Sequence, residues 1–559
     1  MSDLAAVAGG GLSLEFGYPD EQAYAAAVAE LLQDQVASKI AAQDPTLWGA
    51  DAESEAAKRL SWVTLAETSR PLVAEITALR EELQADGVDH VVLAGMGGSS
   101  LAPEVICATA GVELVTLDTT DPGQVRAAIA DNLDRTVLVV SSKSGGTVET
   151  DSHRRAYEKA FTDQGIDPRQ RIVVVTDPGS PLQQTAEDAG YRKVFLADPD
   201  VGGRYSALTA FGLVPSGLAG VDLDALLDSA AEAATVLSVD AESNPGLRLG
   251  ALLGLAHNST SNDGAGCDKV VFADFGSGIA GFGDWAEQLI AESTGKNGRG
   301  LLPVVVEKPQ APGFADAGSD AILIHLVPTS GGYDDSFRPA SGWGAAVSGP
   351  LGGHMLLWEY ATAIAGRIIG INPFDQPNVE EAKKQARALL DASDQGGRDE
   401  PALTDGAVEV FGTGFDLSSA STLTDALQAF LAAAPERGYL SIQAYLDRHA
   451  DAEAANLRPA LARRTGLQTT FGWGPRFLHS TGQYHKGGHP NGVFLQITAD
   501  VSQDAGGDLA VPDRPYTFAS LQQAQAAGDA TVLADKGRPV LHLHLTDRAA
   551  GIEQLLQAL

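Results

Sequence analysis

The stretch "RTVLVVSSKSGGTVETDSHRRAYEKAFTDQG", residues 135–165, passes from a β-branched apolar run through a loop of glycines and hydroxyls into a helical pattern. The same order appears in "HVVLAGMGGSSLAPEVICATAG", residues 90–111, and in "RIVVVTDPGSPLQQTAEDAG", residues 171–190. Short apolar strands that alternate with helical segments indicate a parallel sheet with crossover helices. The sequence therefore predicts an α/β fold.

A second series of apolar strands follows a helical stretch at 221–257. Its members are "KVVFADF", "LLPVVVEK" and "AILIHLV", and later "GVFLQIT" and "PVLHLHL". We expect two α/β/α sandwich domains with parallel sheets and extra helical segments. The expected division is an N-terminal helical arm at 1–80, a first α/β domain at 81–235, a second at 236–390, a helical linking lobe at 391–465, and a C-terminal segment at 466–559 that completes the second domain.

Acidic residues dominate the charge of the chain. The 559 residues include 73 Asp and Glu against 38 Lys and Arg, a formal net charge of −35. Nucleic acid and anionic membranes are therefore poor partners, because the long-range field repels them. The two cysteines have no paired spacing, which disfavours disulfide and zinc scaffolds. The N-terminus has no basic secretory pattern and no apolar run reaches about 18 residues, so we expect a cytoplasmic protein.

Two predicted strand ends carry loops suited to an anion. "AGMGGSS" places Gly98 and Ser99 at a helix start, and the opening stretch places the hydroxyls of Ser142, Ser144 and Thr147 before another. Ligands bind beyond the C-terminal ends of strands in open α/β sheets, and amides at a helix N-terminus favour phosphate. Neither loop matches the dinucleotide fingerprint or the P-loop. The two loops therefore favour a small phosphorylated metabolite.

Two further segments offer an arginine and a carboxylate. Arg204 follows two glycines in "DVGGRYSALTAFG", and a guanidinium can hold a developing oxyanion. Gln288 and Glu292 are four residues apart in "WAEQLIAESTGKNGRG", so they share one helix face. A carboxylate in an apolar cleft has a raised pKa, which suits a general base. Taken alone, each segment is more typical of a solvated or salt-bridged surface residue.

The C-terminal half adds a lysine and three histidines. "INPFDQPNVEEAKKQAR" has Gln376 before a proline and Lys383 in the following helix, where a solvated surface role is the plain alternative. "FLHSTGQYHKGGHPNG" holds His479, His485 and His489. Its flanks lack carboxylates and cysteine, so acid–base chemistry is favoured and we expect no metal.

Together these segments resemble glucose-6-phosphate isomerase. "AGMGGSSLAP", "SSKSGGTVET", "GGRYSALTAFGL", "QLIAESTGK" and "NPFDQPNVEEAK" occur in that family's order and span residues 85–390. "GWGPRFLHSTGQYHKGG" resembles a bacterial subgroup that is often fused to transaldolase; we expect the isomerase alone, because too few residues precede it for that barrel. The resemblance implies two sugar-isomerase domains, a homodimer, and interconversion of glucose 6-phosphate and fructose 6-phosphate in glycolysis and gluconeogenesis, through a cis-enediolate and without cofactor.

The resemblance also implies roles for individual residues. By it, the phosphate loop comprises Ser142, Lys143, Ser144 and Thr147, and the sugar contacts comprise Gly98, Ser99, Gln288 and Gln376. The catalytic residues comprise Glu292 as the base, Arg204 for the enediolate charge, and Lys383 with a histidine for ring opening.

The ring-opening histidine departs from the family's pattern. The family places it between the glutamate and "FDQ", where this chain has only His325, in an apolar strand, and His354, at a helix start. "LHSTGQYHKGG" resembles the usual histidine segment displaced towards the C-terminus, so we predict His479, with His354 as the alternative. Asn378 also replaces a residue that is usually small.

Three other functions stay open. A dual phosphoglucose/phosphomannose isomerase would use the same site, and a partner subunit of transaldolase would lack activity of its own. A non-catalytic sugar-phosphate-binding protein is disfavoured, since such regulators carry a basic DNA-binding segment that is not found here. The presence of Glu292 and Lys383 also favours an enzyme.

Overall fold

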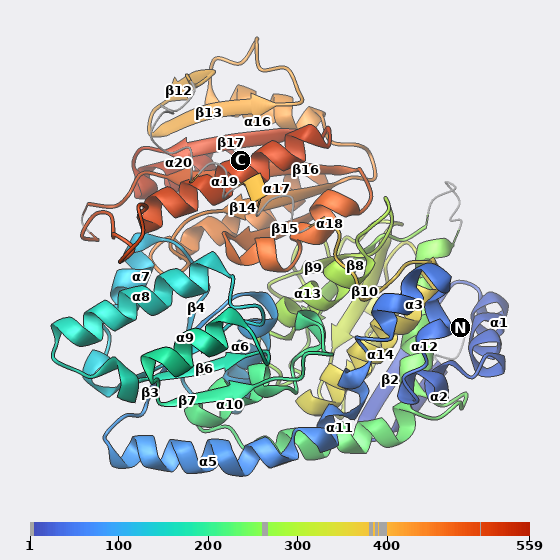
Figure 1. Ribbon diagram of the computed structural model, residues 1–559. Coiled ribbons are helices and arrows are strands. Elements are labelled where there is room, and N and C mark those ends of the chain that lie inside the picture. The colour runs from blue at the N-terminus through green and yellow to red at the C-terminus, as the bar shows by residue number, and fades with distance from the viewer. Residues whose placement is uncertain (1–4, 260–265, 379–383, 386–389, 391–399, 504) are drawn as a thin grey trace.

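Three sheets, each flanked by helices, organise the part of the chain that the structure describes (Figure 1). The computed structural model describes residues 5–259, 266–378, 384–385, 390, 400–503 and 505–559. In Figure 1 the sheet that holds the C-terminal strands lies at the top, above the other two. No helix in these ranges combines the length and the apolar character that crossing a membrane requires.

The first sheet has five parallel strands in the order β4-β3-β5-β6-β7. The strands are β3 His90–Gly95, β4 Val115–Leu117, β5 Thr136–Ser141, β6 Ile172–Thr176 and β7 Lys193–Leu196. The helices are α6 Leu101–Ala110, α7 Pro122–Ala130, α8 Val148–Asp163, α9 Pro181–Ala189 and α10 Ala210–Ala219. Strands β3, β5 and β6 are buried throughout, which explains why they read as continuous apolar runs.

The second sheet has six strands in the order β1-β2-β11-β10-β8-β9. The strands are β1 Ala5–Gly9, β2 Leu12–Gly17, β8 Lys269–Asp274, β9 Leu302–Val305, β10 Ala321–Leu326 and β11 Gly344–Ser348. Strands β8 to β11 are parallel, whereas β2 pairs antiparallel with β11. Residues 5–17 lie in the stretch expected to be a helical arm, yet they form a hairpin that extends this sheet, with β1 at its edge. The alternating burial at the start of β2 is typical of a strand and not of a helix.

The third sheet has six strands in the order β12-β13-β17-β16-β14-β15. The strands are β12 Leu403–Asp405, β13 Val408–Thr413, β14 Tyr439–Ala444, β15 Gln468–Trp473, β16 Gly492–Ala499 and β17 Val540–Leu545. The sequence pattern predicted a helical linking lobe at 391–465 and placed 466–559 in the second domain. In the structure, strands from both segments pair with one another and not with β8 to β11. We therefore propose a third α/β unit here.

The remaining helices belong to the N-terminal arm and to the second and third units. The N-terminal arm comprises α1 Glu21–Gln33, α2 Val36–Ala41, α3 Ala50–Ala56, α4 Leu65–Thr68 and α5 Arg70–Ala85. The second unit carries α11 Leu223–Leu237, α12 Pro245–Asn258, α13 Phe282–Thr294 and α14 Leu351–Ile369. The third carries α16 Leu423–Ala432, α17 Leu457–Thr465, α18 Gly482–Gly487, α19 Phe518–Asp535 and α20 Arg548–Ala558.

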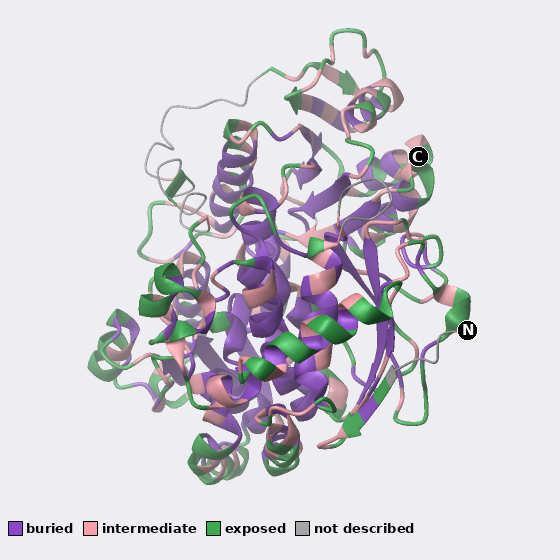
Figure 2. Cartoon of the chain, turned by 90° about the vertical axis from the view of Figure 1, so that its right-hand side faces the viewer, coloured by how far each residue is buried: buried purple, intermediate pink, exposed green. Residues whose placement is uncertain are grey.

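Close helix contact in the second unit depends on glycine. A Cβ added at Gly250 or Gly254 of α12 would come within 2.6 Å of Ile364 or Ile368 of α14. The absence of side chains at these positions lets the two helices pack closely. Figure 2 shows buried residues running through the sheets and these inner helices, while exposed residues lie on the outer helices and loops.

Candidate active site

Two glycine-rich loops follow the neighbouring strands β3 and β5 at the same edge of the first sheet. After β3, a short 3-10 helix at Gly97–Ser99 lies against another at Gly203–Tyr205. A Cβ at Gly98 would lie 2.0 Å from the carbonyl oxygen of Gly203, so only glycine permits this approach. Gly98 and Ser99 are both buried at this contact.

The loop after β5 leads into the N-terminus of α8. The Ser142 Oγ lies 3.1 Å from the Thr147 Oγ1 and accepts a hydrogen bond from the Gly145 amide at 3.2 Å. The Ser144 Oγ accepts a hydrogen bond from the Gly146 amide at 3.3 Å. Thr147 is the N-cap of α8, yet its side chain accepts no hydrogen bond from the first turn. The loop thus gathers three hydroxyls at a helix N-terminus that the Thr147 side chain does not cap, an arrangement suited to an anion.

Lys143 points to a different partner from its neighbours in this loop. Its ammonium lies 2.6 Å from the Asp177 carboxylate and donates a hydrogen bond to the Pro199 carbonyl at 3.1 Å. Burial raises the pKa of Asp177, and the Lys143 ammonium opposes that shift. Lys143 therefore ties the loop to the ends of β6 and β7 in this structure.

Arg204 and Glu292 meet in a buried position between the first two units. The Arg204 guanidinium is 3.5 Å from a Glu292 carboxylate oxygen, and the two side chains are 3 % and 6 % exposed. The Arg204 Nε donates to the Ser293 Oγ at 2.8 Å, which fixes the plane of the guanidinium. Glu292 lies in the last turn of α13, so a helix C-terminus and a low-dielectric setting surround its carboxylate.

Gln288 connects Glu292 to the third unit. Its amide nitrogen lies 3.3 Å from a Glu292 carboxylate oxygen and donates to the His479 carbonyl at 3.0 Å. Gly97 has a φ of +56°, and a Cβ there would lie 2.6 Å from the His479 carbonyl and 2.8 Å from the Gln288 amide. The glycine loop, the carboxylate helix and the histidine segment thus converge at one point.

His479 lies in a 3-10 helix at Arg476–His479 and faces the start of α8. Its Nε2 is 3.0 Å from the Glu149 carboxylate, which is buried. An ionised carboxylate only accepts hydrogen bonds, so Nε2 carries a proton and the lone pair is on Nδ1. The Gln525 amide donates to the same carboxylate oxygen at 2.6 Å, and Thr120 donates to Gln525 at 2.8 Å.

Glu149 and Gln525 are residues that the sequence patterns did not single out. Glu149 stands inside the opening stretch, but an acidic residue in the first turn of a helix reads as a complement to the helix dipole. Gln525 lies mid-way along α19, far away in sequence. No spacing signal links it to Glu149.

The other histidines lie in different surroundings. The His354 ring packs edge-on against Phe282, and neither ring nitrogen has a hydrogen-bond partner among the described residues. Burial lowers the pKa of His354 to about 4, as it does for His325. His485 lies between the Tyr439 and Ser441 hydroxyls, and burial lowers its pKa well below the usual value. These contacts favour His479 over His354 as the reacting histidine.

Two buried cations hold the backbone at residues 372–375. The Arg204 Nη2 donates to the carbonyls of Pro373 at 2.7 Å and Asp375 at 3.0 Å. The Lys296 ammonium donates to the carbonyls of Asn372 and Asp375, both at 2.7 Å, and to the Asp375 carboxylate at 2.6 Å. Burial and the nearby Arg204 charge lower the pKa of Lys296 to about 7.

The predicted sugar contact Gln376 and the predicted catalytic Lys383 follow residues 372–375 in the chain. Gln376 is exposed and follows Asp375 directly, whereas Lys383 lies outside the described residues. Asn378 makes two hydrogen bonds with the Gln483 side chain. The Asn378 backbone N–H donates to the Gln483 Oε1 at 3.0 Å, and the Asn378 Oδ1 accepts from the Gln483 Nε2 at 2.9 Å. The asparagine that departs from the family's pattern therefore has its partner on α18, in the third unit.

Comparisons with known proteins point to one family. Residues 76–307 match the phosphoglucose isomerase family. A protein of Natronomonas pharaonis named probable glucose-6-phosphate isomerase is 30 % identical over 386 residues, 60 % of this chain and 87 % of that protein. A glucose-6-phosphate isomerase of Trichormus variabilis is 27 % identical over 378 residues, 57 % of this chain and 70 % of that protein.

Solved structures give the same picture of the fold. A hypothetical protein from Thermus thermophilus superposes with a TM-score of 0.57 at 26 % identity, covering 67 % of this chain and 99 % of that one. A glucose-6-phosphate isomerase from Chlamydia trachomatis superposes with a TM-score of 0.54 at 17 % identity, covering 70 % and 90 %. The likeness to the second structure concerns the fold alone.

Proposed function

The chain belongs to the glucose-6-phosphate isomerase family, and we propose that the cluster of Arg204, Glu292, Gln288 and His479 is its reaction centre. The enzyme catalyses the reversible isomerisation of glucose 6-phosphate and fructose 6-phosphate. The observation that carries the assignment of residues is the convergence of a buried carboxylate, a guanidinium and the His479 segment beside two glycine-rich loops.

The phosphate binds at the loop after β5. The hydroxyls of Ser142, Ser144 and Thr147 and the first amides of α8 surround the phosphoryl oxygens, while Lys143 supports the loop through Asp177. Gly98 and Ser99, on the neighbouring loop, contact the sugar. Anchoring the phosphate positions the reacting carbons, which turns a bimolecular encounter into an oriented one.

Ring opening comes first. The Nδ1 of His479 takes the proton of the anomeric hydroxyl of glucose 6-phosphate, the bond between C1 and the ring oxygen breaks, and the ring oxygen takes a proton from the Lys383 ammonium. Glu149 holds the imidazole in the tautomer that leaves Nδ1 free to accept this proton. Lys383 assists at the ring oxygen, and Gln376 contacts the sugar next to it.

Proton transfer between carbons follows. The Glu292 carboxylate removes the proton from C2, the C–H electrons form a C1–C2 double bond, and the C1 carbonyl electrons move onto O1. A proton passes from O2 to O1, and Glu292 returns its proton to C1 as the C2 carbonyl forms. Arg204 stabilises the negative charge that develops on the enediolate oxygen. General-base transfer contributes typically about 10²–10⁴-fold, so the anchored phosphate and the guanidinium supply the remaining acceleration.

Glu292→Gln tests the assignment of the base. The variant keeps the volume of the side chain and the Gln288 contact but cannot take a proton. We expect binding of a sugar phosphate to be retained and conversion of fructose 6-phosphate to fall by at least about 10²-fold, measured with chelator present. Retention of near-native turnover would show that another group is the base. Mannose 6-phosphate assayed in parallel separates a dual-specificity enzyme from a glucose-specific one.

The assembly and location of the enzyme stay predictions. We propose a homodimer in the cytoplasm, supported by the resemblance to the family in the five motifs between residues 85 and 390. Sedimentation of the purified protein over a range of concentrations measures the assembly directly. A single species at the mass of one chain would contradict the dimer.

A further inference from the structure

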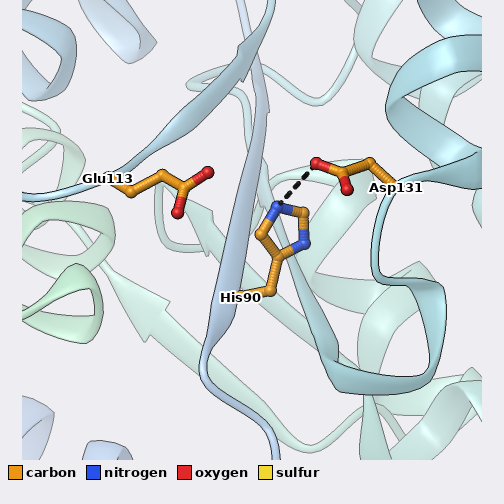
Figure 3. Close-up of side chains that lie close together, drawn as sticks. All are labelled: His90, Glu113 and Asp131. Carbon is orange, nitrogen blue, oxygen red and sulfur yellow. Dashed lines mark ion pairs between the residues drawn. The ribbon is translucent and has the colours of Figure 1, made fainter.

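A histidine and two carboxylates meet at the edge of the first sheet that is remote from the glycine loops. His90 begins β3, Glu113 precedes β4 on one side of it, and Asp131 precedes β5 on the other. One imidazole nitrogen and one oxygen from each carboxylate all lie within 4.8 Å of one another. Figure 3 shows the imidazole between the two carboxylates.

The hydrogen bonds around His90 fix which nitrogen carries its proton. The Thr136 hydroxyl gives its single hydrogen to the Asn132 carbonyl at 2.8 Å, so towards the His90 Nδ1, at 2.9 Å, it acts as the acceptor. Nδ1 therefore donates, and in the neutral ring the lone pair is on Nε2. This is the tautomer in which histidine ligates a metal through Nε2 while its other nitrogen is held by a neighbour.

The Nε2 atom has no hydrogen-bond partner in the part of the chain that the structure describes, although His90 is only 5 % exposed. It faces a carboxylate oxygen of Asp131 at 3.5 Å. A lone pair directed at two carboxylates is repelled by them, and a cation between the three groups removes that repulsion. Ligand atoms of a tetrahedral zinc site lie roughly 3.4 Å apart, given bonds of about 2.0–2.2 Å, so small rotations of two exposed carboxylates complete the geometry.

We propose that His90, Glu113 and Asp131 bind a divalent transition-metal ion, with zinc as the favoured ion. One imidazole and two carboxylates are a donor set suited to zinc, and solvent completes the coordination. The ion joins the beginnings of three adjacent strands and takes no part in the isomerisation, which occurs at the opposite edge of the sheet. Its role is to stabilise the unit that presents the phosphate loop.

Titration of the tag-free, chelator-treated enzyme with zinc chloride tests the site. We expect one saturable equivalent whose affinity falls at least about tenfold in Asp131→Asn and in Glu113→Gln, since even loss of an outer partner typically costs 10–100-fold. Asp134→Asn is the matched control, because Asp134 is an exposed acid three residues from Asp131. Zinc should raise the melting temperature of the wild type and the control, but not of the two site variants.

Three results would contradict the proposal. Equal zinc affinity in the wild type and Asp131→Asn would show that His90 and Asp131 form only an ion pair. If His489→Asn, and not the variants of the proposed site, lost the equivalent of bound zinc, the metal would belong to the His257–His489 pair, whose Nε2 atoms lie 3.4 Å apart. Isomerase activity at 25 °C should be the same with and without zinc, and zinc-dependent turnover would contradict the structural role.

Discussion

The contact between His479 and Glu149 allows ring opening to be tested apart from proton transfer. The perturbation is Glu149→Gln, which keeps the shape of the side chain and removes its charge. The 3.0 Å hydrogen bond from the His479 Nε2 to a buried carboxylate is charge-assisted, and such bonds contribute about 1.5–3 kcal/mol. At 1.36 kcal/mol per factor of ten, we expect kcat/KM for fructose 6-phosphate to fall roughly 10–200-fold.

The assay compares two substrates. Fructose 6-phosphate must open its ring, whereas its 5-deoxy analogue lacks the hydroxyl that closes the ring and is always open. Because Glu149 acts through the ring-opening histidine, Glu149→Gln and His479→Asn should affect turnover of the first substrate only. Glu292→Gln should abolish turnover of both, since proton transfer between C2 and C1 is needed in either case.

His489→Asn serves as the matched control, because it changes a histidine of the same segment whose ring faces His257 instead. Thermal unfolding of each variant checks that a loss of turnover is not a loss of fold. If Glu149→Gln lowered turnover of both substrates equally, or of neither, His479 would not be the ring-opening group and the reasoning from its position would be wrong.

Three further outcomes follow from the same geometry. Gly97→Ala should lower the free energy of unfolding by roughly 1–3 kcal/mol and lower turnover more than tenfold, since a φ of +56° disfavours alanine and the new Cβ would push against the His479 carbonyl. Denaturant unfolding measures the first effect and initial rates measure the second. Gln525→Leu should lower kcat about tenfold on fructose 6-phosphate but not on the 5-deoxy analogue, because Glu149 loses a hydrogen bond at 2.6 Å. Equal losses of kcat on both substrates would contradict the link from Gln525 through Glu149 to His479. The free energy of unfolding should rise with pH between about 7 and 10.5, by up to roughly 1.4 kcal/mol per pH unit, because burial lowers the pKa of Lys296 to about 7 in the folded protein. In this range the lysine is protonated in the unfolded chain and neutral in the folded one, so raising the pH favours the folded state. Unfolding titrations should show this rise in the wild type and not in Lys296→Met.

The sequence predicted the strongly apolar strands, missed others such as β1, β2, β12 and β13, and predicted the grouping of the strands only in part. Strands β3, β5 and β6 are apolar throughout, because both faces of a parallel sheet are covered. The same apolar pattern in β16 and β17 does not reveal which sheet they join, because periodicity reports burial and not the identity of the neighbour. The hairpin of β12 and β13, which turns at Gly406 and Ala407, carried a glycine turn signal that the helical interpretation of 391–465 overlooked.

The candidate site shows a similar limit. Arg204, Gln288 and Glu292 were predicted from local motifs and lie together, and their catalytic roles stay predictions. Lys296 was missed because "GKNGRG" reads as a turn, in which a lysine is usually solvated, whereas here it is 1 % exposed. One sequence does not show that α19 contacts Glu149 or that α18 contacts Asn378, since these contacts depend on how the third unit packs against the other two.

The proposed reacting groups come from helices of three separate units, which has a consequence for how the enzyme forms. Each unit can acquire its own helices and strands early, but the constellation exists only after all of them have associated, and association of preformed units is commonly a late event. On dilution from denaturant, recovery of catalytic competence should therefore trail the return of far-ultraviolet circular dichroism, and the interval between them would time the assembly of the interior.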